Sequence, residues 1–168
     1  MNVQLEQSEK LVAALRDELE TYGGILAALD NQQDAVMARA ADALMDTVHQ
    51  IHGQMVEVEQ ARERRERARH IAAVALGLRD DCTFREMIPV LPQHYQGLVT
   101  ALVEENNELL VRVQQRTRQN HMLLRRSVDL MQTFLASLFP RQGTQVYDQH
   151  GGLPGRVIPL RSIYEAVG

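Results

Sequence analysis

Apolar residues recur at helical spacing along two long stretches of this chain. The repeat gives an α-helix one narrow apolar seam, which is typical of helices that pack lengthwise on a partner helix. The pattern therefore predicts an all-α protein built as a long antiparallel helical bundle or coiled coil. The seam positions of the first stretch are Leu15, Leu19, Tyr22, Leu26, Leu29, Gln33, Val36, Ala40, Leu44, Val48, Ile51, Met55 and Val58. Those of the second are Leu98, Leu102, Leu109, Val113, Leu123, Leu130, Phe134 and Leu138.

The first helical region is expected over about residues 3–78, because no proline interrupts it. Two places within it could break the helix. One is the pair Gly23–Gly24, since each glycine costs about 1 kcal/mol relative to alanine. The other is the polar segment at Asn31. The seam stays in phase from Leu29 to Val36, which favours a continuous helix.

A linker is expected over residues 79–92, followed by a second long helix over 93–139. Thr83 and Glu86 have the spacing of a capping box, so they predict a short helical turn within the linker. A linker of this length lets the chain reverse. The two seams are therefore expected to pack antiparallel in one bundle of residues 1–140.

Two asparagines, Asn106 and Asn120, lie in or beside the second seam among apolar neighbours. A seam asparagine usually fixes the register of packed helices at some cost in stability. We therefore expect a structural role for both rather than a contact with a ligand.

The last part of the chain, residues 141–168, is rich in glycine and proline and is expected to form a mobile tail. After Pro159 it carries apolar residues at helical spacing. A helix of about nine residues does not hold alone in water, so this segment needs a surface to fold on. That surface could belong to its own bundle or to a partner protein. The apolar residues are Leu160, Ile163, Tyr164 and Val167, with Val157 and Ile158 just before them.

Composition narrows the classes of function. The 168 residues fit one domain, and the low aromatic content of 4% without tryptophan disfavours base stacking on nucleic acid. The net charge of −4 is too small to point to a polyanion or a membrane surface. We expect no integral membrane segment and no secretory signal, and the single Cys82 suits a reducing compartment. These features predict a cytoplasmic protein.

No set of side chains has the spacing of a catalytic or metal site. His49 and His52 could face one metal ion from a single helical turn, but no third ligand accompanies them. Cys82 follows Asp80 and Asp81, and such acidic neighbours disfavour a reactive thiolate. We therefore expect no catalytic residue, no metal, no bound cofactor and no enzymatic activity.

A run of arginines near the end of the first helical region raises the alternative of nucleic-acid binding. It is interleaved with Glu63 and Glu66, which offer local pairing along the helix. In a basic zipper the basic segment precedes the heptads, whereas here it follows them. A solvated helix face is the better interpretation. The run contains Arg62, Arg64, Arg65, Arg67 and Arg69.

Several segments, taken in order, resemble the FlgN-type flagellar export chaperones. The first helix opens with Leu19, Tyr22, Leu26 and Leu29, and near its end Val58-Glu59 is followed by Arg62. The segment Met87-Ile88-Pro89-Val90-Leu91-Pro92 is similar to that family's linker, and Glu105-Asn106-Asn107-Glu108-Leu109-Leu110 to its second long helix. Tyr147-Asp148-Gln149-His150-Gly151 resembles the family's Tyr-x-x-x-Gly sequence.

This resemblance implies a non-enzymatic cytoplasmic chaperone. Its clients would be hook-associated proteins of the FlgK and FlgL type, which it would keep unassembled and deliver to the export-gate protein FlhA. By position, Tyr147 and Gly151 would dock on the gate. The client-binding residues would be Val157, Ile158, Leu160, Ile163, Tyr164 and Val167. Two alternatives stay open from the residues alone: a structural coiled-coil adaptor, and a nucleic-acid-binding helical protein.

Overall fold

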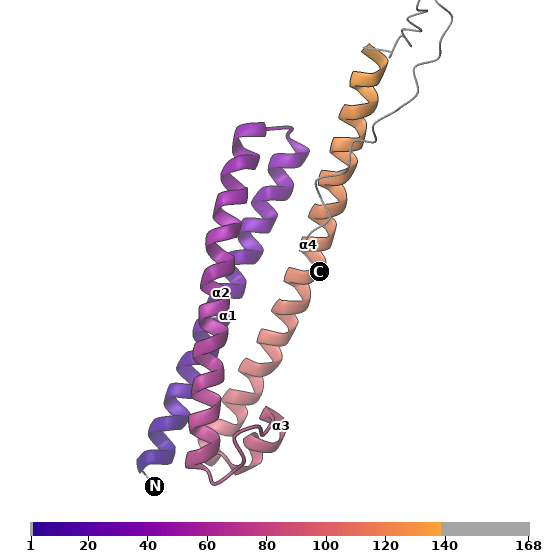
Figure 1. Ribbon diagram of the computed structural model, residues 1–168. Coiled ribbons are helices and arrows are strands. Elements are labelled where there is room, and N and C mark those ends of the chain that lie inside the picture. Colours follow the sequence, from indigo (N-terminus) through magenta and orange to yellow (C-terminus); the bar gives the residue numbers. More distant parts are fainter. Residues whose placement is uncertain (1, 139–168) are drawn as a thin grey trace, which may run out of the picture. The chain divides into compact units, whose positions relative to one another are not determined.

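The computed structural model describes residues 2–138, which form four α-helices, a short 3₁₀ turn and no strand (Figure 1). The helices are α1 (Asn2–Met37), α2 (Ala41–Ala75), α3 (Phe84–Met87) and α4 (Gln93–Leu138), and the 3₁₀ turn η1 (Ile88–Val90) follows α3. The predicted all-α class is confirmed, as is the second long helix within a residue of its expected bounds.

The expectation of one continuous first helix is wrong. The chain reverses at residues 38–40, and neither Gly23–Gly24 nor Asn31 breaks it, since both lie inside α1. Arg39 adopts a left-handed conformation with φ 54°, and its N–H donates to the carbonyl of Val36 at 3.1 Å. Glycine is the usual residue at such a helix end. Because an arginine stands there instead, the sequence carries no signal for the reversal.

Helices α1 and α2 form an antiparallel hairpin. Arg64 contacts Asp17 at 2.6 Å, and Gln4 Nε2 donates to the carbonyl of Ala75 at 3.3 Å. Residues farther along α2 thus meet residues nearer the start of α1, as an antiparallel pair requires. Small side chains on α2, such as the fully buried Ala61, let the two backbones approach closely.

Helix α4 runs parallel to α1 and antiparallel to α2. Asn106 bonds the carbonyl of Leu15, and Asn120 bonds that of Leu29, both at a sequence separation of 91. A constant separation means that the two helices advance together. The predicted antiparallel packing of the two seams is therefore confirmed for α2 with α4. The reversal at residues 38–40, which was not predicted, adds the antiparallel pair of α1 and α2 and makes α1 and α4 parallel.

The hydrophobic core gathers where the linker joins α2 to α4. It takes residues from α1, α2, the linker and α4, and it includes Cys82, which is 5% exposed. The predicted capping box is confirmed, because Glu86 N–H donates to Thr83 Oγ1 at 3.3 Å and Thr83 N–H to Glu86 Oε2 at 2.7 Å. The largest fully buried side chains of the hydrophobic core are those of Leu11, Leu15, Met87 and Val99.

Residues 1–130 form one compact unit, and α4 from Met131 onward falls outside it. The residues beyond 138, which contain the whole predicted tail, lie outside the described part of the chain.

Candidate partner-binding surface

The contact between α1 and α4 depends on two buried asparagines. Asn106 Nδ2 donates to the carbonyl of Leu15 at 3.0 Å, and Asn120 Nδ2 donates to that of Leu29 at 2.7 Å. The two asparagines are 14 residues apart, as are the two leucines, so each pair repeats after two heptads. Sliding α4 by one residue would break both contacts, which supports the register role expected from the sequence.

Each of these asparagines also has an unsatisfied acceptor. The Oδ1 atoms of Asn106 and Asn120 are buried and have no hydrogen-bond partner. An unpaired buried polar atom costs about 1–3 kcal/mol. Farther along the same contact, Arg116 Nε lies 2.6 Å from Asp30 Oδ1, and Arg116 also bonds Gln33. Polar groups thus align α4 on α1 with only modest gain in stability.

A buried ionic cluster joins α1 to α2 near the middle of the hairpin. Glu18 is 3% exposed, and its carboxylate accepts a hydrogen bond from the Tyr22 hydroxyl at 3.0 Å. Arg65 Nε lies 3.0 Å from Glu18 Oε2, but its N–H does not point at a hydrogen-bond acceptor, so this contact is an ion pair. Burial and the Glu18 carboxylate raise the pKa of Tyr22 to about 12. Sequence reasoning missed this cluster, because Glu18 is one of two adjacent carboxylates between Leu15 and Leu19 and nothing in the spacing marks it as buried.

The arginine run of α2 serves mostly to hold the fold together. Arg64 pairs with Asp17, Arg65 with Glu18, and Arg69 donates to the carbonyls of Asp80 and Cys82. The expected solvated face is right for Arg62 and Arg67 and wrong for Arg65 and Arg69, whose side chains are about four-fifths buried. Because these arginines are engaged within the chain, the run gives little support to nucleic-acid binding.

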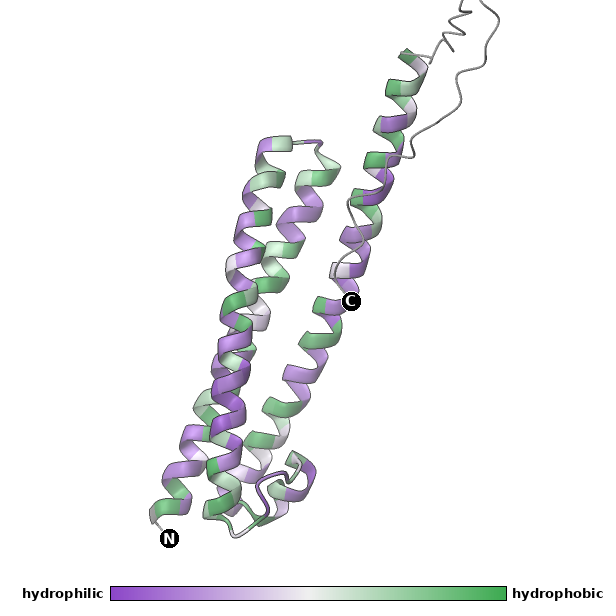
Figure 2. Ribbon diagram, viewed as in Figure 1, coloured by the Kyte–Doolittle hydropathy of each residue, from purple (hydrophilic) through white to green (hydrophobic). Residues whose placement is uncertain are grey.

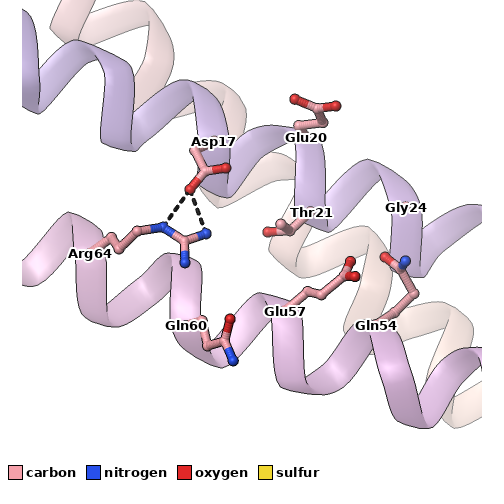
Figure 3. Close-up of a pocket in the computed structure, with 8 residues that line it drawn as sticks. All are labelled: Asp17, Glu20, Thr21, Gly24, Gln54, Glu57, Gln60 and Arg64. Atoms are coloured by element: carbon pink, nitrogen blue, oxygen red, sulfur yellow. Dashed lines mark hydrogen bonds and ion pairs between the residues drawn. The ribbon is translucent and has the colours of Figure 1, made fainter.

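A polar hollow lies on one side of the hairpin, between α1 and α2 (Figure 3). Gly24 leaves room for Gln54, because a Cβ at Gly24 would lie 2.4 Å from Gln54 Oε1. Glu20 and Glu57 also line it, and Arg64 closes one end by pairing with Asp17. This hollow has no apolar patch that would attract a partner.

The residues weighed for metal or thiol chemistry stay apart. His49 is exposed and its Nδ1 lies 2.9 Å from the carbonyl of Met45, while His52 is exposed on the same helix. Within residues 2–138 no three histidine, cysteine or carboxylate side chains gather as a metal site would need. Cys82 is packed in the hydrophobic core.

The strongest candidate for partner binding is the apolar end of α4, where green turns alternate with purple ones in Figure 2. We call this the α4 stripe. Its residues lie at helical spacing and are 49–65% exposed. Exposed apolar clusters of this kind mark interaction sites. The stripe consists of Leu130, Met131, Phe134, Leu135 and Leu138. The sequence seam included Leu130, Phe134 and Leu138, which are 55–62% exposed rather than buried as seam residues would be.

The residues predicted to bind the client and the gate lie beyond the described part of the chain. They are Tyr147, Gly151, Val157, Ile158, Leu160, Ile163, Tyr164 and Val167. Their roles stay predictions.

Comparisons with known proteins gave one match, to a family model. Neither the curated proteins nor the solved structures gave a significant match. No helix within residues 2–138 is long and apolar enough to cross a membrane. The family model described as FlgN protein matches residues 1–155, which include all of the described helices. The chain therefore belongs to the FlgN protein family, a family of flagellar export chaperones.

Proposed function

We propose that this protein is a cytoplasmic export chaperone for hook-associated proteins of the FlgK and FlgL type. It would bind an apolar helical segment of its client, prevent premature assembly, and deliver the client to the export gate through FlhA. The observation that carries the proposal is the exposed α4 stripe on a chain of a chaperone family.

The stripe suits a client that must later be released. Fully burying one large apolar side chain contributes about 1.5–3 kcal/mol, and the stripe residues are already partly covered by their own helix. Binding also costs translational freedom and the ordering of side chains. The net affinity is then moderate, as a chaperone that hands its client onward requires.

The tail carries the finer part of the proposal. By resemblance to the family, Tyr147 and Gly151 would contact the export gate, and Val157, Ile158, Leu160, Ile163, Tyr164 and Val167 would add to client binding. If this glycine-rich and proline-rich segment orders when it binds, the loss of conformational entropy would keep that binding reversible.

The test is isothermal titration of the full chain with a C-terminal helical fragment of a FlgK-type protein. Phe134→Glu should weaken binding at least about tenfold, because it places a carboxylate in an apolar contact. Gln132→Glu is the matched control, since Gln132 is exposed two residues away and outside the stripe. Absence of binding by the unmodified chain would refute the proposal. Self-association in its place would favour the coiled-coil adaptor.

A further inference from the structure

Helix α2 carries a second apolar stripe that its own hairpin covers only in part, since two of its residues are exposed and the other three are half-buried. We define the α2 stripe as Leu44, Val48, Ile51, Met55 and Val58. The α1 side of α2 instead buries Thr47 and places Gln54 against Gly24. Val48 is therefore 45% exposed and Met55 58% exposed, although the sequence placed both in a packed seam.

The stripe leads into a hollow of about 330 Å³ enclosed by α1, α2, α3 and α4. Its steps of four and three continue from Val58 to Arg62 and Arg65, and both arginines line this hollow. Leu15 and Tyr22 of α1 line it as well, together with Val103 and Leu110 of α4. The apolar face of α2 and the hollow are thus parts of one surface.

Two arginines, Arg62 and Arg85, line the hollow besides the paired Glu18 and Arg65, so its lining carries a net positive charge. Arg62 lies 3.6 Å from Glu59 and its side chain is half exposed. Arg85, at the start of α3, is exposed and forms no ion pair within residues 2–138. Figure 1 shows α3 beside the lower parts of α2 and α4, so a helix that follows the α2 stripe toward Arg62 would meet it.

Charge decides which end of such a helix fits. A helix carries partial negative charge at its C-terminus, and a free chain end adds a carboxylate. Both are attracted by the two rim arginines, whereas a positively charged helix N-terminus would be repelled. An occupant in this direction would run parallel to α2 and antiparallel to α1 and α4.

We propose that the α2 stripe and the arginine-rimmed hollow seat one amphipathic helix of the client, with its C-terminal carboxylate against Arg62 and Arg85. This rests on the proposed function and assigns the client a second contact besides the α4 stripe. A bound helix would cover Val48 and Met55 and complete a four-helix arrangement.

The experiment titrates the full chain and its variants with a C-terminal helical fragment of a FlgK-type protein. Met55→Glu should weaken binding at least about tenfold by placing a charge in the apolar contact. Val56→Glu should leave affinity within about twofold, because Val56 is 49% exposed but lies outside the stripe. Val48→Glu is the second stripe variant, and circular dichroism verifies that all three fold as the parent does.

The role of the rim arginines is tested by changing Arg85 and by removing the charge of the fragment's C-terminal carboxylate. Arg85→Glu should weaken binding about threefold to fivefold, while Arg112→Glu, on an exposed face of α4, should not. Amidation of the fragment's C-terminus should weaken its binding to the parent chain. It should have little effect on its binding to the Arg85→Glu variant.

The outcomes separate the two proposals. No binding to the parent chain refutes the proposed function. Parent binding with unchanged affinity for both Met55→Glu and Val48→Glu overturns only the α2 site. If Met55→Glu instead converts a dimer to a monomer by sedimentation without loss of client affinity, the stripe binds a second copy and the inference is wrong.

Discussion

Replacing Asn106 by leucine should stabilise the protein slightly, although it removes two hydrogen bonds. The Asn106 amide donates to the carbonyls of Leu15 at 3.0 Å and Leu102 at 2.9 Å. Both carbonyls lie inside α-helices, where the backbone N–H four residues later also bonds them. Losing the two side-chain bonds therefore costs about 1 kcal/mol each and strands no acceptor.

The gain comes from the unpaired oxygen. Asn106 is 6% exposed and its Oδ1 is buried without a partner, a cost of about 1–3 kcal/mol that Asn106→Leu removes. Burying the apolar leucine side chain adds about 2 kcal/mol, part of which is lost in repacking. The net expectation is a free energy of unfolding about 1 kcal/mol higher.

Asn106→Asp has nearly the same shape and should act in the opposite direction. It would place a carboxylate beside two carbonyl oxygens with no donor, which costs about 3 kcal/mol at neutral pH. Burial would raise the pKa of that new carboxyl above its usual value of about 3.9. The deficit should then be small in acid and grow as the pH rises past about 4.

Urea denaturation followed by far-ultraviolet circular dichroism measures all three chains. A loss of 2 kcal/mol or more in Asn106→Leu would refute the reasoning, because it would mean that Oδ1 is satisfied in solution. Asn106→Asp with parental stability at neutral pH would contradict it equally.

Two further predictions concern the buried cluster of α1 and α2. Because the pKa of Tyr22 is raised to about 12, the unfolded chain releases a proton between pH 10 and 12 that the folded chain keeps, so stability should fall over this range. Urea denaturation at several pH values should show that the free energy of unfolding falls less for Tyr22→Phe than for the parent between pH 10 and 12. An equal fall would contradict the raised pKa of Tyr22. Arg65→Met should cost about 3 kcal/mol by leaving Glu18 buried without its cation. Adding Glu18→Gln should recover part of that loss, and no recovery would show that packing rather than charge is responsible.

The sequence by itself determined the local features of this protein. Helical spacing predicted the long helices, and Thr83 with Glu86 predicted the capped turn of the linker. Asn106 and Asn120 were identified as seam residues because two polar side chains at such positions stand out among apolar neighbours. All of these depend on residues close together in the chain, and the repeat of the α-helix makes such patterns readable.

Only the tertiary structure decided where the chain turns and which side of each helix is covered. The reversal at residues 38–40 uses a left-handed Arg39, so no glycine or proline announced it. On α2, helical spacing allows either Thr47 or Val48 to face a partner helix. In the structure Thr47 is buried, whereas Val48 is 45% exposed. Glu18 and Arg65 pair across 47 residues of sequence, and neither one reveals the other. Which of two adjacent residues is buried, and which distant residues pair, depends on the helix packed alongside. The spacing of residues along the sequence does not contain that information.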